Sequence, residues 1–251
     1  MYFVYNIFLK FIILFSPFIF FLRILNKKED PIRFLEKFCI YKNKNNNLKV
    51  IWLHAASIGE LYSIVPVIKK LEKSKKIKKI LLTTSTTSSA KVVKKIKFKK
   101  TSHKFYPLDS DNITKKFISY WKPQLAIFVD SEIWPNMFKN LRENNIPIIL
   151  VNARITKKSF KRWKNFEKFA KEIFSKITLA LPSNLETQNY LKILGVSNIK
   201  VAGNLKFYGE RKKQTKNNIK NKFKNLKVWC AASTHKGEEQ LIYELHNNVK
   251  K

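Results

Sequence analysis

Between residues 50 and 201, short apolar runs alternate with longer amphipathic segments. The short runs have the length of strands, and the longer segments repeat apolar residues at helical spacing. This alternation is typical of βαβ units, which build a parallel sheet with helices on its faces. The pattern predicts strands at Val50–His54, Ile80–Thr84, His103–Tyr106, Leu125–Asp130, Ile146–Val151, Ile177–Leu181 and Ile199–Val201. It predicts helices at Glu60–Ser74, Ser89–Lys97, Ile113–Trp121, Pro135–Asn144, Lys158–Phe174 and Leu185–Leu194.

Residues 2–25 are almost wholly apolar, and their length is near that of a spanning helix. Lys10 and Pro17 interrupt the run, and basic residues such as Arg23, Lys27 and Lys28 follow it. The positive-inside rule then keeps the downstream chain on the cytoplasmic side of the membrane. We expect residues 1–26 to form a retained membrane anchor helix, either spanning the bilayer or lying in its interface. The alternative is a buried N-terminal helix of a soluble domain.

A break in the pattern follows the last predicted strand. Residues 209–225 are rich in Lys and Asn and read as a linker. A new strand at Val228–Ala232 and a helix from about Glu239 to Val249 come after it. One strand and one helix cannot bury a core. We therefore expect a complete domain at 48–208 and only the beginning of a second domain at 226–251.

The chain has a formal net charge of +34, from 51 Lys+Arg against 17 Asp+Glu. A basic surface attracts nucleic acid, but the bidentate contacts of nucleic-acid readout come mainly from Arg, and only six of the basic residues are Arg. The abundance of Lys, Asn, Ile and Phe indicates drift toward A/T-rich codons. We therefore expect no nucleic-acid partner and favour an anionic membrane surface.

The cysteines and histidines do not form a recognisable metal motif. Cys39 and Cys230 are far apart in the sequence, and the four histidines form no ligand cluster. We expect no metal and no cofactor.

Two carboxylates stand where a predicted strand ends and a helix begins. Glu60 follows the first strand, and Glu132 precedes the helix that Pro135 opens. Ligands of open α/β sheets bind outside the carboxyl ends of the strands, so both acids are candidates for chemistry. Each also has a purely structural interpretation. Glu60 is an acid favoured in the first turn of a helix, and Glu132 is a capping acid of the next helix.

The segments around these acids resemble the 3-deoxy-D-manno-octulosonic acid (Kdo) transferases, bacterial glycosyltransferases of lipid A assembly. The resemblance is carried by motifs in the family's order: His54 to Glu60, ending in Gly-Glu; the Thr/Ser-rich loop Thr83 to Ser89; Ser131 to Asn136, with Glu-x-Trp-Pro-Asn; Val151-Asn152-Ala153-Arg154 with Ser159; Ala202 to Phe207, with Gly-Asn-Leu-Lys-Phe; and Ala232 to Glu239, with Ser-Thr-His-x-Gly-Glu-Glu.

The resemblance implies an α/β glycosyltransferase of the GT-B type, with a Rossmann-like N-terminal domain built on a parallel sheet and a second Rossmann-like domain. The N-terminal domain would take the acceptor, a lipid A precursor (lipid IVA). The second domain would take CMP-Kdo. Transfer of Kdo would invert the anomeric carbon and need no metal, as a step of lipopolysaccharide core biosynthesis.

The resemblance also assigns roles to residues. Glu60 corresponds to the family's general base, which must take the proton of the attacking sugar hydroxyl. Glu132 would bind hydroxyl groups of the acceptor or of Kdo.

Cations and helix N-termini must neutralise the leaving phosphate when no metal does so. Arg154 and Lys206 are the candidate cations, each in a motif at the end of a strand. Ser233, Thr234 and His235 precede the last helix, which would direct backbone N–H groups at a phosphate. His235 has the alternative interpretation of an ordinary first-turn residue.

One feature departs from the family pattern. The family's second domain continues well beyond the Ser-Thr-His motif and supplies much of the CMP site, whereas this sequence reaches only Lys251. We therefore interpret the chain as a C-terminally truncated transferase. The alternative is a catalytically inactive acceptor-binding or membrane-surface-binding domain.

Overall fold

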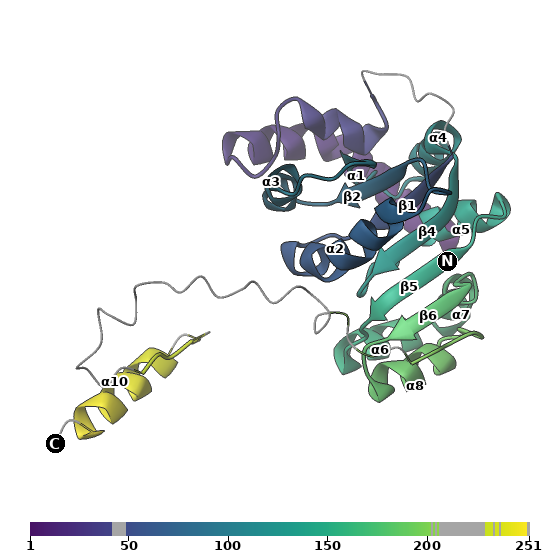
Figure 1. Cartoon of the computed structure of the whole chain (residues 1–251). Helices are drawn as coiled ribbons and strands as arrows, with labels where there is room; N and C mark the ends of the chain where they lie inside the picture. The colour runs from purple at the N-terminus through teal and green to yellow at the C-terminus, as the bar shows by residue number, and fades with distance from the viewer. Residues whose placement is uncertain are drawn as a thin grey trace. The chain divides into compact units, whose positions relative to one another are not determined.

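The computed structural model describes residues 1–41, 49–201, 203, 205, 229–232, 234, 235 and 237–249. The chain divides into two compact units, Met1–Glu210 and Arg211–Lys251. The first unit holds a parallel sheet and every helix that the structure describes except α10 (Figure 1).

Six strands form one parallel sheet in the order β3-β2-β1-β4-β5-β6. They are β1 (Val50–His54), β2 (Ile80–Thr84), β3 (Thr101–Phe105), β4 (Pro123–Val129), β5 (Ile148–Ala153) and β6 (Leu179–Pro182). The parallel α/β fold predicted from the alternation is therefore confirmed, with strand ends that differ by a few residues. The predicted seventh strand at Ile199–Val201 is wrong. Pairing there stops at a single bridge between Ala180 and Ile199, too short to extend the sheet.

Helices connect the strands and cover both faces of the sheet. They are α2 (Ile58–Lys73), α3 (Thr87–Lys95), α4 (Asp111–Trp121), α5 (Pro135–Glu143), α6 (Lys157–Lys164), α7 (Glu167–Phe174) and α8 (Leu185–Ile193). Ser57, Thr86, Thr156 and Asn184 begin four of these helices, and each side chain accepts a backbone N–H from the first turn. Pro135 stands in the first turn of α5, where its missing N–H costs nothing.

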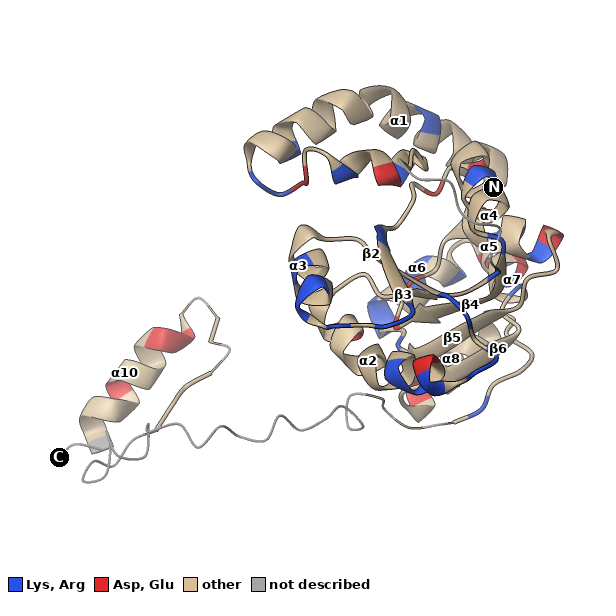
Figure 2. Cartoon of the chain, turned by 45° about the horizontal axis from the view of Figure 1, so that its top comes forward, with Lys and Arg blue, Asp and Glu red and all other residues tan. Residues whose placement is uncertain are grey.

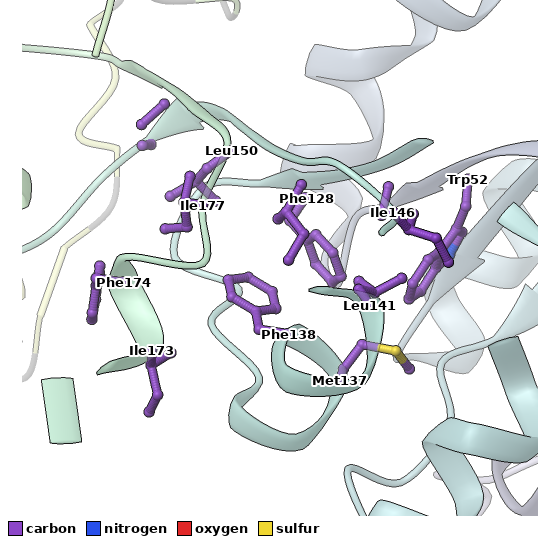
Figure 3. Close-up of a cluster of buried hydrophobic side chains, with 14 of the residues drawn as sticks. Trp52, Phe128, Met137, Phe138, Leu141, Ile146, Leu150, Ile173, Phe174 and Ile177 are labelled. Atoms are coloured by element: carbon purple, nitrogen blue, oxygen red, sulfur yellow. The ribbon is translucent and has the colours of Figure 1, made fainter. Parts of the chain in front are cut away.

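The two faces of the sheet bury separate hydrophobic clusters, because successive strand residues point to opposite sides. In β1, Trp52 joins the cluster formed with α4, α5 and α7, while Leu53 joins the cluster formed with α2 and α3. Figure 3 shows the first cluster, in which Phe128 of β4 faces Phe138 of α5 with ring centroids 4.9 Å apart (Figure 3). The central strands are thus covered on both faces, and the loops at their carboxyl ends extend from this core.

The helix predicted at Lys158–Phe174 is wrong in one respect, because α6 and α7 are separate. In a continuous helix, Phe166 would share a buried face with Trp163 and Ala170. Instead the chain turns at Asn165, Phe166 is 54% exposed, and Phe169 is buried against the first cluster. The break lets α7 direct Phe169 and its neighbours into the core.

The N-terminal run forms one helix, α1 (Tyr2–Leu25), followed by the short 3-10 helix η1 (Arg33–Phe38). Figure 2 shows α1 almost entirely without charge (Figure 2). Only 11% of its most apolar window is buried, with a mean hydropathy of 2.2. By length and composition α1 is able to cross a membrane, and it is not the buried helix of the alternative interpretation.

The second unit contains α10 (Glu238–Val249), close to the predicted helix. The predicted strand at Val228–Ala232 is not confirmed. Residues 229–232 have no regular structure, and Val228 lies outside the described residues. A strand needs a paired neighbour to satisfy its backbone groups, and no strand of the described second unit offers one.

Candidate active site

The candidate site lies where the strand order reverses. β1 and β4 are neighbours at the centre of the sheet, although β2 and β3 come between them in the sequence. Ligands of such sheets bind at the carboxyl ends of this strand pair. The loop after β1 leads to Glu60, and the loop after β4 carries Glu132. The two predicted carboxylates therefore lie at the same edge of the sheet, after neighbouring strands.

Glu60 closes a hydrogen-bonded turn at the start of α2. Its Oε1 accepts the hydroxyl of Ser57 at 2.8 Å, and its Oε2 accepts the backbone N–H of Ala56 at 2.8 Å. The Ser57 hydroxyl in turn accepts the backbone N–H of Glu60. This resembles a capping box, except that the carboxylate accepts the N–H of Ala56, the residue before the N-cap Ser57. The interpretation of Glu60 as a first-turn acid thus describes its geometry correctly. Each oxygen keeps a second lone pair for a further partner.

The surroundings of Glu60 make its carboxylate more basic. Partial burial raises the pKa of this carboxyl group above its usual value, while the bonds from Ser57 and Ala56 lower it. The negative charges of Glu132 and Asp130 raise the pKa further. A general base works best when its pKa approaches the working pH, so the direction of this shift suits that role.

Glu132 is fixed through one of its two oxygens. The indole N–H of Trp134 donates to Oε2 at 2.9 Å, and Nε2 of His54 lies 3.2 Å from the same atom. Among the described residues, Oε1 has no hydrogen bond, and the side chain stays 19% exposed. The interpretation of Glu132 as the cap of α5 is wrong, because Trp134 occupies the N-cap position and no side chain there makes a cap bond.

His54 is a site residue to which the sequence analysis gave no role. It is the last residue of β1, is fully buried, and packs on Tyr106 with ring centroids 4.0 Å apart. The available signal was its place at the carboxyl end of a strand, one strand away from Glu132. The sequence analysis considered this histidine only as a possible metal ligand.

Asp109 is a second residue that the sequence analysis missed, and it binds the first turn of α5. Its Oδ1 accepts the backbone N–H of Met137 at 2.8 Å, and its Oδ2 accepts the backbone N–H of Asn136 at 3.1 Å. The same Oδ2 accepts the hydroxyl of Tyr5 in α1 at 2.8 Å. Asp109 thus joins the N-terminal helix to the motif that carries Glu132.

Asp109 gives the fold a pH dependence of known sign. Burial raises the pKa of this carboxyl to about 7, against the opposing effect of its hydrogen bonds. Because the unfolded pKa is about 4, the group favours the folded state at low pH. This contribution is lost as the pH rises through about 7.

We expect the free energy of unfolding of the wild type, relative to Asp109→Asn, to fall as the pH rises from about 5 to about 8. Urea unfolding of both proteins at a series of pH values measures this difference. A difference that stays constant across the range contradicts the expectation.

The Asn-Ala-Arg turn connects two of the family-like motifs. Asn152 has a left-handed backbone, with φ of 52°, and its Oδ1 accepts the backbone N–H of Leu205 at 3.1 Å. The Ser131 hydroxyl donates to the backbone carbonyl of Arg154, so this turn also meets the loop that carries Glu132. The Arg154 side chain is exposed. Lys206 lies outside the described residues.

The predicted phosphate-binding residues belong to the second unit. His235 is 85% exposed at its side chain, and its backbone N–H donates to Glu238 at 2.8 Å. Thr234 lies 3.5 Å from a Glu239 oxygen. The carboxylate of Glu238 thus accepts a backbone N–H that we predicted would bind phosphate. This is the arrangement of an ordinary helix start. Ser233 lies outside the described residues.

The comparison with protein families decides which family this arrangement belongs to. The family described as 3-deoxy-D-manno-octulosonic-acid transferase (kdotransferase) matches residues 32–208, which include both carboxylates. The chain belongs to this family. Membership accounts for the ordered motifs on which the resemblance rests.

Curated relatives carry the same family name. A 3-deoxy-D-manno-octulosonic acid transferase of Rickettsia bellii is 36% identical over 239 residues, which cover 93% of this chain and 56% of the relative. One of Haemophilus influenzae is 27% identical over 206 residues, which cover 78% of this chain and 47% of the relative. The chain thus spans about half the length of these relatives.

A solved structure supports the fold alone. A Listeria monocytogenes protein described as a UDP-N-acetylglucosamine 2-epimerase matches with a TM-score of 0.51 at 12% identity. The match covers 70% of this chain and 52% of that one.

Proposed function

We propose that this protein acts as a Kdo glycosyltransferase, which moves Kdo from CMP-Kdo to a lipid A precursor such as lipid IVA in lipopolysaccharide core biosynthesis. The observation that carries the proposal is the pair Glu60 and Glu132 at the strand-order reversal, inside the segment that the Kdo transferase family matches. Reaction with inversion and without a metal is part of the proposal.

The proposed chemistry begins with the acceptor hydroxyl. Glu60 takes its proton as the oxygen attacks the anomeric carbon of Kdo, and the bond to the CMP phosphate breaks. The raised pKa of Glu60 supports this role. Oε1 of Glu132, which has no hydrogen bond among the described residues, accepts one from a sugar hydroxyl. Arg154 and Lys206 stabilise negative charge near the leaving group.

The predicted phosphate-binding residues belong to donor binding in this proposal. Ser233, Thr234 and His235 at the start of α10 contribute to the CMP site in this proposal, and residues 226–251 begin the donor domain. Residues 48–208 are the proposed acceptor domain, and the proposed linker, 209–225, lies outside the described residues.

Release of CMP from CMP-Kdo tests the function. We expect the chain to release CMP only when lipid IVA is present as acceptor. Release that does not depend on the acceptor, or no release at all, contradicts the proposal.

A second candidate is a non-catalytic domain that binds the acceptor at a membrane surface. It is favoured by the apolar residues that α1 exposes, such as Phe3, Phe8 and Phe11, which suit a membrane surface. Calorimetric titration separates the two functions. Measurable affinity for CMP supports the transferase, whereas binding of lipid IVA vesicles without affinity for CMP supports the second candidate.

We propose further that α1 lies in the interface on the cytoplasmic face of the inner membrane. One side of α1 is bound to the protein: Tyr5 to Asp109, and Asn6 to the Nδ2 of Asn136 at 2.7 Å. Near its other end, Phe20 packs on Phe38. A spanning orientation would break these contacts. The opposite side exposes large apolar residues that suit the acyl boundary: Phe3, Val4, Ile7, Phe8, Phe11, Leu14, Phe15, Phe18 and Leu22.

Substitution on the outer side of α1 tests this placement. Phe11 and Phe15 are each 58% exposed and stand one turn apart. Burial of each phenyl ring in the acyl boundary is worth about 1.5–3 kcal/mol, so we expect Phe11→Glu/Phe15→Glu to weaken vesicle binding at least about tenfold. Sedimentation with vesicles that contain anionic phospholipid measures the effect.

Leu185→Glu is the matched control, because Leu185 is 68% exposed on α8. We expect it to bind vesicles as the wild type does. Unchanged binding by the α1 double variant would contradict the interfacial placement.

A further inference from the structure

A row of buried polar side chains runs from the core of the sheet to Glu132. The indole N–H of Trp52 donates to the Thr83 hydroxyl at 2.9 Å, and Nδ1 of His54 lies 3.0 Å from the same hydroxyl. Nε2 of His54 then lies 3.2 Å from Glu132. Trp52, Thr83 and His54 are fully buried. We refer to Trp52, Thr83, His54 and Glu132 as the buried relay.

The first member of the relay constrains its direction. The Trp52 indole can only donate, so the Thr83 oxygen accepts this bond with one of its two lone pairs. Thr83 then has one hydrogen to donate. Its two candidate acceptors are His54 Nδ1 at 3.0 Å and the carbonyl of Leu53 at 3.4 Å. The shorter contact favours His54 Nδ1 as the acceptor.

The other end of the imidazole leads to the same assignment. A neutral histidine carries its hydrogen on one ring nitrogen only. If Nδ1 carried it and donated to the Thr83 carbonyl at 3.2 Å, the lone pair of Nε2 would face the Glu132 carboxylate. That carbonyl already accepts the backbone N–H of Ala55 at 3.0 Å. An imidazolium ion would satisfy both ends, but a fully buried charge carries a large desolvation cost.

We propose that the buried relay fixes His54 as the neutral Nε2–H tautomer, which donates to Oε2 of Glu132 and holds this side chain with Oε1 directed to substrate. Thr83 and His54 are then positioning residues for Glu132. The role of Glu132 toward substrate rests on the proposed function, whereas the tautomer of His54 does not.

The relay has a consequence for the second carboxylate. The charge of Glu132 raises the pKa of Glu60, so a relay that holds Glu132 in place also bears on how basic Glu60 is. With both donors on Oε2, Oε1 of Glu132 has no hydrogen bond among the described residues and can accept a sugar hydroxyl. The relay would thereby separate the roles of the two acids, one as base and one as fixed acceptor.

Nitrogen NMR of the full chain with labelled histidine tests the proposal without substrate. His54→Asn identifies the His54 signals by their loss. In the wild type we expect a protonated Nε2 and an unprotonated Nδ1 that accepts a hydrogen bond. A protonated Nδ1, in either the other tautomer or an imidazolium ion, would overturn the proposal.

Two threonines allow a matched comparison. We expect Thr83→Ser to keep the wild-type His54 signals, and Thr83→Val to shift the Nδ1 signal to that of an unprotonated nitrogen without a hydrogen bond, because valine has no hydroxyl to donate. Thr84→Val is the control, because Thr84 is equally buried but contacts Nε2 of His103 at 3.0 Å. Wild-type His54 signals in Thr83→Val would also overturn the proposal. If Thr83→Val does not fold, the wild type and Thr83→Ser decide.

This experiment is independent of the proposed function. An inactive chain with the expected tautomer contradicts the transferase activity and leaves the relay intact. An active chain in which His54 has the other tautomer supports the transferase activity and contradicts the relay.

Discussion

Glu60→Gln is expected to lower the rate of CMP release about 10²–10⁴-fold, the range typical for loss of a general base. The amide cannot accept the proton of the attacking hydroxyl. Its carbonyl oxygen still accepts a hydrogen bond from Ser57 or Ala56, so the start of α2 is kept in large part. Initial rates with saturating CMP-Kdo and lipid IVA, together with the unfolding temperature, measure the effect.

A control variant separates catalysis from helix stabilisation. Glu167 stands in the first turn of α7, is 55% exposed, and pairs with Lys171. Glu167→Gln removes a first-turn charge as Glu60→Gln does, and we expect it to leave the rate within about twofold, since such charges are worth less than about 1 kcal/mol. If Glu60→Gln keeps the wild-type rate, the base is another residue.

Phe138→Ala is expected to lower the free energy of unfolding by about 3–5 kcal/mol, the usual cost of removing a buried aromatic ring. Phe138 is fully buried between α5 and the sheet, and its ring meets Phe128 edge to face. Removal of the ring would leave a cavity between α5 and β4. Because these two elements also hold the loop of Glu132, we expect them to move little toward each other to fill it. Urea unfolding measures the loss.

Phe166→Ala makes the same chemical change at a position that is 54% exposed, between α6 and α7. We expect it to change the free energy of unfolding by less than about 1 kcal/mol. Equal losses in the two variants would contradict the assignment of the core to the α4, α5 and α7 face.

The sequence predicts most of the sheet because its strands are short apolar runs buried on both faces. Trp52 and Leu53 enter opposite clusters, so a continuous run such as Val50–His54 is recognisable without a partner. The incorrect helix and strand predictions arise where tertiary contacts determine the local structure. Local spacing cannot show that Phe166 turns outward, or that Ile199 finds one bridging residue and no more.

The candidate site was predictable to the extent that it depends on strand ends. Glu60 and Glu132 follow β1 and β4, and parallel strands bring their carboxyl ends to one edge. The residues that hold Glu132 and its loop in place were not predictable. His54 contacts Glu132 across 78 positions of sequence, and Asp109 reaches Asn136 across 27, so only the fold reveals them.

Product analysis tests the central claim most directly. The full chain is incubated with CMP-Kdo and lipid IVA, and the acceptor lipid is examined by mass spectrometry. The proposal predicts a lipid product heavier by one or more Kdo residues, and its absence from a parallel reaction with Glu60→Gln. An unmodified acceptor in the wild-type reaction, under conditions in which the chain binds lipid IVA vesicles, would contradict the transferase and favour the binding domain.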